Sequence, residues 1–258
     1  MGPFPPARES QAAHRSAIGI HFSRPLIAGR FLRRLNRFAA LVAVNGKREP
    51  VHVRNSGRLR ELLRPGRPVL LEPAATPGRR TRCTLAIARL PGGDVSADAH
   101  LPNALVEEGL RRRGVPGFGG YRLVRREFVI GQNRVDFLLA RGERKCLLEV
   151  KSATLVEGGV ALFPDAPTER GRKHLEHLVA ARRHGLLAAV LFVVQRGDAT
   201  AFAPNEEADR EFADTLRRAV RAGVRVRAVR CRVTPEGVWL DRSLPVRWPA
   251  RRPHPQRD

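Results

Sequence analysis

The sequence contains no long apolar segment. Its longest uninterrupted apolar run, from Leu186 to Val194, has nine residues, far fewer than the roughly 20 that a membrane-spanning helix needs. The first residues, Met-Gly-Pro-Phe-Pro-Pro, lack the apolar stretch of a signal peptide, and Pro6 stands where a myristoylation motif has Ser or Thr. We therefore expect neither a membrane span nor a secretory leader, and no membrane partner.

Cysteine is scarce as well. The three cysteines, Cys83, Cys146 and Cys231, are far apart in the sequence. An odd number of widely spaced cysteines provides neither a disulfide framework nor a zinc-binding pattern. We expect reduced thiols and a protein of a bacterial or archaeal cytoplasm, with association with the nucleoid left open.

Acidic residues and lysine are the other shortages. The chain has 48 Lys and Arg against 25 Asp and Glu, a net charge of +23, and only four of the 48 are Lys, which leaves 44 Arg. Such an excess favours a polyanionic partner, nucleic acid before an anionic membrane surface. The alternative is that the near-exclusive use of Arg reflects a GC-rich genome, in which case part of the charge has no functional meaning.

The sequence pattern changes near residues 99–101 and divides the chain into two regions. Residues 21–100 are rich in short strands and turns, and we expect an OB-like nucleic-acid-binding domain there. Residues 101–248 alternate helices and strands, as in an α/β sandwich with a mixed sheet, so the fold class is α/β (α+β overall). Residues 1–20 and 249–258 show no periodicity, and we expect flexible tails.

Turn signals separate the expected strands of residues 21–100. Asn45-Gly46 and Pro65-Gly66 are two of these signals, and one short helix is expected from Arg58 to Leu63. Strands interrupted by one helix are typical of a small Greek-key barrel of OB type. The expected strands are Leu26 to Leu35, Phe38 to Val44, Pro50 to Val53, Pro68 to Glu72, Arg80 to Leu90 and Asp94 to Ala97.

Barrels of this type bind single strands along a basic groove. The side chains that could line such a groove here are Arg30, Arg33, Arg34, Arg37, Arg54 and Arg58. Asn55 and Ser56, with Gly57 and Arg58, could form a pocket for a phosphate or a base. The alternatives are that the arginines are merely solvated and that Asn55 and Ser56 only cap the following helix.

Residues 101–248 show the alternation of a mixed-sheet domain. Leu186 to Gln195 reads as a strand buried on both faces, and Phe212, Leu216 and Val220 mark one apolar helix face. The expected helices are Asn103 to Arg113, Thr168 to His184 and Asp209 to Ala222; the other expected strands are Tyr121 to Ile130, Arg134 to Ala140, Lys145 to Ser152, Val224 to Val233 and Val238 to Leu240.

Two tight turns align three acidic residues in the first three of these strands. With Gly131-Gln132 as a two-residue hairpin turn, Glu127 faces Asp136; with Gly142-Glu143 as the next turn, Asp136 faces Glu149. Facing Cβ atoms in antiparallel strands lie roughly 4.5–5.5 Å apart, and Lys151 shares the face of Glu149. The expected apolar set on the other face is Val135, Phe137, Leu139, Cys146, Leu148 and Val150.

A row of carboxylates destabilises a sheet unless a cation compensates it. Mg²⁺ or Mn²⁺ suits such a site, because these ions prefer carboxylate oxygens, waters and substrate phosphate. The Lys151 ammonium could hold an attacking water and stabilise charge on phosphoryl oxygens. Asp136, Glu149 and Lys151 therefore have the composition of a metal-assisted phosphodiesterase site. The alternative is surface acids paired with Arg126 and Arg134.

A basic cluster at the start of the expected helix from Thr168 is a second candidate. Arg170, Arg172, Lys173 and His174 could clamp a phosphate beside the metal, where free backbone N–H groups also attract anions. A solvated first turn is the alternative. His174 and His177 are spaced as helical neighbours, but no third metal ligand is evident, so exposed helix positions are the better interpretation.

The chain resembles the sugar fermentation stimulation protein A family over roughly Gly29 to Val233. The stretches that carry the resemblance are Arg30 to Phe38, His52 to Leu59, Leu101 to Asn103, Arg134 to Leu139, Leu148 to Leu155, Phe163 to Leu175 and Val193 to Arg196. One departure is Val53-Arg54 before Asn-Ser-Gly-Arg-Leu, where the family usually has Cys-Pro or a similar pair before Asn-Thr-Gly-Arg-Met.

The resemblance implies an OB-like domain joined to a PD-(D/E)XK restriction-endonuclease-like domain, with DNA binding and a role in regulating sugar (maltose) genes. It also implies that the nuclease signature falls on Asp136, Glu149 and Lys151, with Glu127 as an extra acid and Gln195 near the same end of the sheet. The expected metal ligands are Asp136, Glu149, Glu127 and the Val150 carbonyl.

Two hypotheses follow from the sequence. The first is a DNA-binding, Mg²⁺- or Mn²⁺-dependent nuclease, and the second is a DNA-binding transcriptional regulator that uses a nuclease scaffold without its chemistry. Single- or double-stranded DNA is left undecided, RNA is not excluded, and a homodimer stays open. Aromatic residues make up only 5% of the chain, which favours phosphate binding over base stacking.

Overall fold

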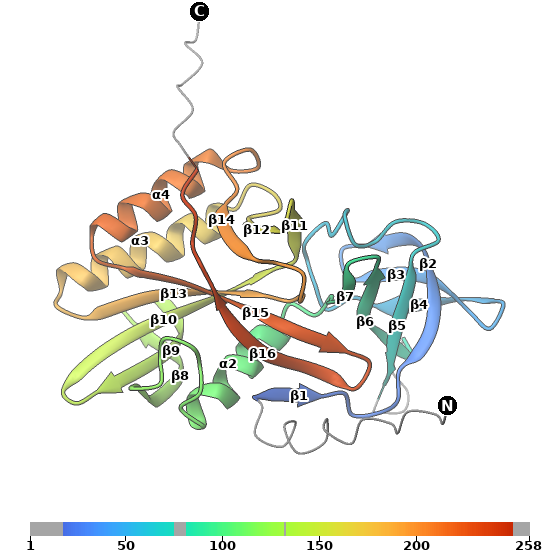
Figure 1. The fold of residues 1–258 in the computed structure, drawn as a ribbon, viewed down its shortest axis with the longest axis horizontal. Helices are drawn as coiled ribbons and strands as arrows, with labels where there is room; N and C mark the ends of the chain where they lie inside the picture. Colours follow the sequence, from blue (N-terminus) through green and yellow to red (C-terminus); the bar gives the residue numbers. More distant parts are fainter. Residues whose placement is uncertain (1–17, 75–80, 132, 250–258) are drawn as a thin grey trace, which may run out of the picture.

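The computed structural model describes residues 18–74, 81–131 and 133–249. They form two domains side by side, a β-barrel and a larger mixed-sheet domain (Figure 1). No helix among these residues is long and apolar enough to cross a membrane. The barrel and the mixed sheet each have their own buried apolar clusters, and the chain passes from the last barrel strand to the first helix of the mixed-sheet domain between residues 96 and 101.

The barrel is a six-stranded sheet in the order β4-β3-β2-β5-β6-β7. It curls until β4 and β6 meet, through the pair His52–Thr84, and the enclosed core includes Phe31, Val42 and Leu85. This contact closes β2 to β6 into a small barrel, and β7 extends the sheet beyond β6. Its strands are β2 (Ile27–Asn36), β3 (Ala39–Val44), β4 (Lys47–His52), β5 (Pro68–Pro73), β6 (Cys83–Leu90) and β7 (Gly93–Ser96).

The helix expected from Arg58 to Leu63 is wrong. The segment is irregular and contains one hydrogen-bonded turn, in which the Leu62 and Leu63 N–H groups donate to the Leu59 carbonyl at 3.1 and 2.8 Å. Leu59 has φ +48°, a left-handed conformation that a helix cannot contain. Leu59, Leu62 and Leu63 are buried in the barrel, so packing of these leucines favours the turn over a helix.

The second domain is built on a seven-stranded sheet in the order β1-β16-β15-β13-β10-β9-β8. β13 is the central strand and every one of its residues after Leu187 is buried, as expected for a strand covered on both faces. The strands are β1 (Gly19–His21), β8 (Arg122–Ile130), β9 (Asn133–Arg141), β10 (Arg144–Ala153), β13 (Leu187–Val194), β15 (Arg225–Thr234) and β16 (Gly237–Leu244).

Helices cover both faces of this sheet. α2 (Leu101–Arg111) packs on one face through Leu105, Val106 and Leu110. On the other face lie α3 (Glu169–Arg183) and α4 (Arg210–Arg221), which are capped by Thr168 and Asp209. Val135 packs with the α3 and α4 side, whereas the other five members of the expected apolar set lie in the α2 side cluster.

Two features of this domain were not expected. A small three-stranded sheet follows β10, made of β11 (Leu155–Glu157), β12 (Val160–Phe163) and β14 (Ala201–Pro204). In addition, Gly19 and Ile20 are not part of a tail, because β1 pairs with β16 at the edge of the large sheet. The barrel is therefore inserted between two elements of the mixed-sheet domain, β1 and α2.

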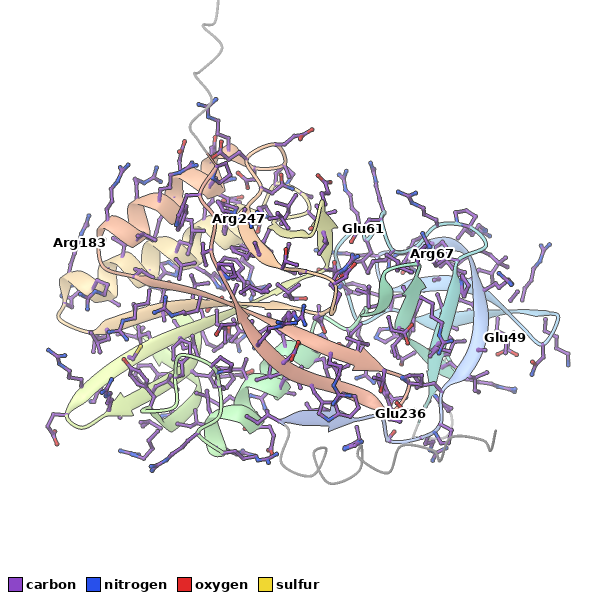
Figure 2. The ribbon with its side chains drawn as sticks, in the orientation of Figure 1. Glu49, Glu61, Arg67, Arg183, Glu236 and Arg247 are labelled. Carbon is purple, nitrogen blue, oxygen red and sulfur yellow. The ribbon has the colours of Figure 1, made fainter. Side chains whose placement is uncertain are left out.

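The two domains are joined by polar and apolar contacts. The Gln195 carbonyl accepts from the Ser96 N–H at 3.1 Å, the Gln195 Nε2 donates to the Asp98 carbonyl at 2.9 Å, and Val95 forms a bridge with Arg196. Glu61 of the barrel, visible at the junction in Figure 2, accepts from the Thr154 hydroxyl at 3.2 Å. The chain joins the barrel to the mixed-sheet domain twice, after β1 and before α2, and the contacts above add a third connection. Together they hold the barrel beside the C-terminal ends of β10 and β13.

Candidate active site

The second hairpin brings Asp136 and Glu149 together. β9 and β10 pair from Arg141–Arg144 to Phe137–Leu148, which is the register expected from the Gly142-Glu143 turn. The ladder ends one pair before Asp136 and Glu149. Beyond that point the Val150 N–H donates to the Asp136 Oδ2 at 2.7 Å, so a side chain satisfies the backbone where the strands separate.

Asp136 is held by two donors. Besides the Val150 N–H, the Asn103 Nδ2 at the start of α2 donates to its Oδ1 at 2.8 Å. The pKa of Asp136 is raised above its ordinary value, first by burial and then by the negative charge of Glu149. These two effects outweigh both hydrogen bonds, so Asp136 is a carboxylate whose negative charge lacks full compensation.

Glu149 is buried on the α3 side of the sheet and has two partners. The Lys151 Nζ donates to its Oε1 at 2.7 Å, and the His174 Nδ1 of α3 contacts the same oxygen. Burial by itself would raise the pKa of Glu149, but the hydrogen bond of His174 and the charge of Lys151 lower it below the ordinary value. Glu149 is therefore ionised and points at the ammonium of Lys151.

His174 links α3 to this cluster. The Arg170 Nε donates to the His174 Nε2 at 3.3 Å, and the His174 Nδ1 lies against the Glu149 Oε1 and 3.1 Å from the Lys151 Nζ. The sequence predicts a place for His174 in a possible phosphate clamp, not as a partner of Glu149, and it assigns Asn103 no role. His174 lies 20% exposed beside Glu149. Helical spacing alone could not find this contact, since it depends on how α3 crosses the sheet.

The donor set suits a hard divalent cation. Two carboxylates, Asp136 and Glu149, lie at the end of one hairpin, and Mg²⁺ commonly uses one or two carboxylates together with waters and a substrate phosphate. A cation would also relieve the repulsion that raises the pKa of Asp136. Among the described residues, no group of three or more His, Cys, Asp and Glu side chains has the arrangement of a complete metal site.

Glu127 does not join these two carboxylates. The register of β8 and β9, with Arg126 opposite Phe137 and Phe128 opposite Val135, brings Glu127 across from Asp136 as expected. However, Glu127 has φ +48°, its side chain is 57% exposed, and its Oε2 lies 3.6 Å from Arg134. The expectation of three carboxylates on one face is therefore wrong for Glu127, because the local backbone turns its side chain outward.

Gln195 lies near the site without touching the carboxylates. Its Nε2 donates to the Ser152 Oγ at 2.9 Å as well as to the Asp98 carbonyl. Its Oε1 is buried and has no hydrogen-bond partner among the described residues. Gln195 therefore connects the strand end that follows Lys151 to the segment between the two domains, and its direct part in chemistry stays a prediction.

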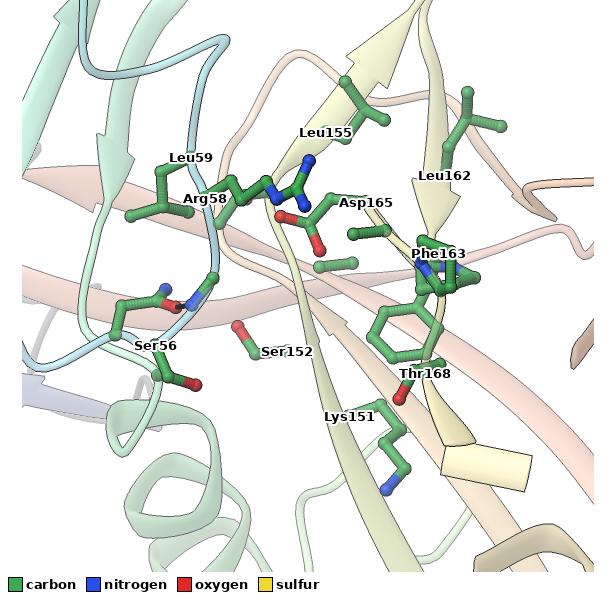
Figure 3. A pocket seen from close by; sticks show the side chains of 18 residues that line it. Ser56, Arg58, Leu59, Lys151, Ser152, Leu155, Leu162, Phe163, Asp165 and Thr168 are labelled. Carbon is green, nitrogen blue, oxygen red and sulfur yellow. Dashed lines mark hydrogen bonds between the residues drawn. The ribbon is translucent and has the colours of Figure 1, made fainter. Parts of the chain in front are cut away.

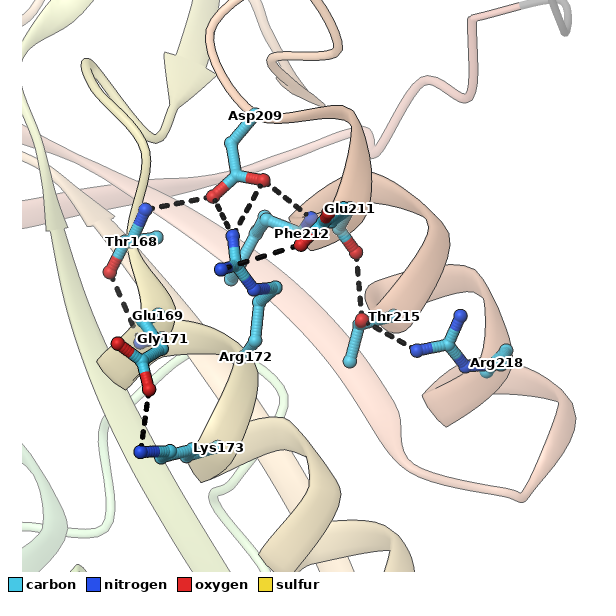
Figure 4. A network of polar contacts seen from close by, with 10 residues as sticks. All are labelled: Thr168, Glu169, Gly171, Arg172, Lys173, Asp209, Glu211, Phe212, Thr215 and Arg218. Atoms are coloured by element: carbon cyan, nitrogen blue, oxygen red, sulfur yellow. Dashed lines mark hydrogen bonds and ion pairs between the residues drawn. The ribbon is translucent and has the colours of Figure 1, made fainter. Parts of the chain in front are cut away.

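The basic cluster of α3 is mostly engaged in pairs. Arg172 donates to both oxygens of the buried Asp209 at 3.0 and 2.8 Å and joins α3 to the cap of α4 (Figure 4). Lys173 pairs with Glu169 at 2.7 Å on the exposed side. A phosphate clamp that uses Arg172 would have to break a buried ion pair, which leaves Arg170 as the member nearest to the carboxylates.

A cavity of about 680 Å³ opens beside Lys151, between the two domains. Figure 3 shows Lys151, Ser152 and Asp165 from the mixed-sheet domain, with Ser56 and Arg58 of the barrel across from them. A second cavity, of about 660 Å³, lies on the barrel. Its polar and basic lining consists of Arg33, Arg34, Asn36, Arg37, Ser56, Arg58 and Arg60.

These cavities divide the groove residues expected from the sequence. Arg33, Arg37 and Arg58 line the barrel cavity, whereas Arg30 lies outside it and donates to the Gly66 carbonyl at 3.1 Å. Arg54 pairs with Asp98 at 3.1 Å in the link between the domains. The structure thus brings together part of the expected groove and adds a cavity that the sequence did not reveal.

Family models match both domains. The description "SfsA N-terminal OB domain" matches residues 32–97, and "Sugar fermentation stimulation protein RE domain" matches residues 100–237. The boundary between the two matches falls at the change of fold described above. The N-terminal OB domain and the restriction-endonuclease-like domain are therefore shown by sequence and by fold together.

Curated relatives and one solved structure extend this likeness over most of the chain. A sugar fermentation stimulation protein homolog of Chloroflexus aggregans is 45% identical over 86% of this chain and 85% of its own length. One from Caldanaerobacter subterraneus is 44% identical over 81% and 91%. The structure of Pyrococcus furiosus SfsA in complex with Ca²⁺ covers 90% of this chain and 99% of that chain, with 31% identity and a TM-score of 0.82.

Proposed function

This chain belongs to the sugar fermentation stimulation protein family, and we propose that it is a DNA-binding nuclease that hydrolyses phosphodiester bonds with the help of a divalent cation. One observation carries the proposal. Asp136 and Glu149 end the same hairpin, and the Lys151 Nζ lies 2.7 Å from the Glu149 Oε1 at the wall of a cavity between the two domains.

Asp136 and Glu149 would hold the cation, with the Val150 carbonyl as a third oxygen. Mg²⁺ or Mn²⁺ is the expected ion, and the Ca²⁺ complex of the Pyrococcus furiosus relative supports a divalent cation in this family. When bound, the cation would polarise the phosphoryl oxygens and lower the pKa of an attacking water. Glu127 would contribute only after leaving Arg134, so its expected part as a ligand is the weakest of the four.

The protein's own residues supply positioning and charge. The Asn103 and Val150 donors keep the Asp136 carboxylate in one orientation. Glu149 holds the Lys151 ammonium at the cavity wall, where it can bind a phosphate oxygen or orient a water for in-line attack. An ammonium in a partly buried site stabilises developing negative charge more strongly than it would in water.

Two lysines on β10 allow a matched test. Lys151 lies at the site, whereas Lys145 is exposed at the other end of the same strand. With Mg²⁺ or Mn²⁺, we expect Lys151→Ala to reduce hydrolysis of plasmid, linear or single-stranded DNA by about 10²–10³-fold, and Lys145→Ala to change it less than about twofold. Hydrolysis that is equal in both variants, or absent from the wild type on every substrate, would remove the proposal.

A regulator without chemistry is the second candidate. The observation in its favour is that Lys151 and His174 both contact the Glu149 Oε1, so protein groups already compensate that carboxylate. This candidate predicts metal-independent DNA binding that survives Asp136→Ala and gives a sequence-specific footprint at promoters of sugar genes. A footprint that ignores sequence would count against it. In either case the expected location is the cytoplasm.

A further inference from the structure

The two cavities share a wall. Ser56, Gly57 and Arg58 line both the cavity between the domains and the cavity on the barrel. On the far side of this loop, the cavity between the domains reaches Lys151 and Ser152. A chain that follows the barrel cavity and crosses the loop therefore arrives at Lys151, whose Nζ contacts Glu149.

The loop that separates the cavities is held in one conformation. The Gly57 N–H donates to the Asn55 Oδ1 at 2.8 Å, and Asn55 is only 8% exposed. The Arg34 NH2 donates to the Arg37 carbonyl at 2.6 Å and reaches the carbonyls of Asn55 and Gly57. These contacts fix the backbone while the exposed side chains of Ser56 and Arg58 have no hydrogen bond or ion pair with any described residue.

The passage over the loop is narrow. A Cβ atom added at Gly57 would lie 3.3 Å from the Asp165 Oδ2 of the other domain, so the loop and the Asp165 side chain are nearly in contact at this point. A cavity of about 680 Å³ falls in the range of pockets that enclose one drug-sized molecule, about 300–1,000 Å³. One or two nucleotides have that size, and a base-paired segment of several pairs is larger.

The lining provides for both parts of a nucleotide. Leu155, Leu162 and Phe163 offer an apolar surface for a base. Since the Ser152 Oγ accepts from the Gln195 Nε2, its own proton is free to be donated to a phosphate. The Asp165 carboxylate would repel a phosphate but can accept a hydrogen bond from an N–H group on the edge of a base, such as the N3–H of thymine.

We propose that the cavity between the domains binds an unpaired nucleotide of the DNA strand next to the scissile phosphate, with the adjoining strand lying in the arginine-lined cavity of the barrel. This inference rests on the proposed function and makes it more specific: the substrate is single-stranded or locally unpaired DNA. Ser56 and Arg58 are binding residues shared by both parts of the strand, and Gln195 is a positioning residue for Ser152.

The buried cysteines make a direct test available. Cys83, Cys146 and Cys231 are all buried, so a thiol introduced by Ser56→Cys reacts selectively with a maleimide. The experiment measures its rate of labelling in EDTA, without cleavage, in the presence of an oligothymidine or of a hairpin duplex with the same number of phosphates. Fluorescence anisotropy measures binding of both DNAs separately. Ser243→Cys is the control, because Ser243 is exposed and lines neither cavity.

We expect saturating oligothymidine to slow labelling of Ser56→Cys by about tenfold or more, and the duplex to slow it by less than about twofold, with Ser243→Cys unaffected by either. Equal protection by the duplex, or binding of oligothymidine without protection, overturns the inference. Neither result bears on the nuclease proposal, which the Lys151→Ala and Lys145→Ala variants test. Stronger protection by oligouridine than by oligothymidine overturns DNA as the strand. Binding of neither DNA overturns the inference together with the proposed DNA binding.

A charge-matched pair of variants gives an independent readout. Arg58 lines both cavities, and Arg48 is exposed on β4 outside them. Because each phosphate contact to a single strand contributes about 0.7 to the slope of log affinity against log salt, Arg58→Ala should reduce that slope by about 0.7. Arg48→Ala should leave it unchanged within error, and equal slopes for the two variants contradict the inference.

Discussion

The hairpins β8–β9 and β9–β10 share a strand and have a similar plan, yet only one of them forms part of the site. In both, a glycine with positive φ begins the turn, Gly131 in the first and Gly142 in the second. In both, the register brings an acidic residue across from Asp136. Glu149 is 3% exposed and contacts Lys151, whereas Glu127 is mostly exposed and contacts Arg134.

The difference lies in the local backbone and in what covers each strand. β10 is a central strand between β9 and β13, and α3 packs over its end with His174 beside Glu149. β8 is the edge strand, and Glu127 has the left-handed φ of +48° that turns a side chain away from the regular pattern. Register thus decides which residues are neighbours along a sheet, but burial and backbone conformation decide which of them share a site.

The largest expected effect separates the two acids by activity. Since Glu149 lies in the cluster and Glu127 outside it, we expect Glu149→Ala to reduce metal-dependent hydrolysis by about 10²–10³-fold and Glu127→Ala to change it less than about twofold. The measurement is the initial rate on labelled single-stranded DNA with Mn²⁺. A loss of similar size in Glu127→Ala would mean that Glu127 leaves Arg134 and joins the site when substrate binds.

Metal binding should show the same division without any cleavage. A ligand at one hundred times its Kd stabilises the folded state by about 2.7 kcal/mol, which corresponds to a rise in Tm of about 5–10 °C for a chain of this size. We expect Mn²⁺ to raise the Tm of the wild type and of Glu127→Gln to a similar extent, and that of Asp136→Asn hardly at all. An equal rise in all three would place the cation elsewhere.

The supporting hydrogen bonds give a smaller effect. Asn103 donates to the Asp136 Oδ1, and loss of a group that orients a metal ligand commonly weakens metal affinity by about 10–100-fold. Asn103→Ala should therefore raise the Kd for Mn²⁺ within that range. Arg134→Ala removes the partner of Glu127 instead. Because this pair is exposed, its loss should lower the free energy of unfolding by less than about 1 kcal/mol. The Kd for Mn²⁺ should stay unchanged. Titration calorimetry of both variants tests the contrast.

Much of this arrangement could be predicted from the sequence because local signals set it. Gly142-Glu143 fixed the register of β9 and β10, and the alternation of apolar residues along β10 assigned Glu149 and Lys151 to one face. α3 and α4 begin after the caps Thr168 and Asp209 and end just before Gly185 and Gly223, as those residues indicated. Turns and helix caps can be predicted from the sequence because they depend on residues only a few positions apart.

The parts that sequence reasoning missed depend on distant contacts. β11, β12 and β14 are only three or four residues long, and β12 pairs with β14 across the whole of α3 and β13. β1 finds its partner near the other end of the chain. The cavity beside Lys151 has one wall from residues 55–59 and another from residues 151–155. No local pattern contains such pairings, since they exist only after the domains have packed.

The smallest effect concerns the stability of the folded protein in the absence of metal, which should depend on pH in opposite ways through Asp136 and through Glu149. Burial and the charge of Glu149 raise the pKa of Asp136 above its ordinary value of 3.8. Protonated Asp136 therefore stabilises the folded protein below pH 3.8, and this contribution is lost as the pH rises through the folded-state pKa. The pKa of Glu149 is lowered despite its burial, so its contribution is present above its ordinary value of 4.5 and is lost as the pH falls.

The two isosteric variants should therefore change stability in opposite directions. In EDTA at pH 8, Asp136→Asn should be more stable than the wild type and Glu149→Gln less stable, and both differences should shrink toward pH 4. Urea unfolding at a series of pH values measures them. Saturating Mn²⁺ should reverse the sign for Asp136→Asn, because only the wild type then gains the binding energy of the cation. A gain that persists in Mn²⁺ would show that Asp136 is a strained structural carboxylate and not a ligand.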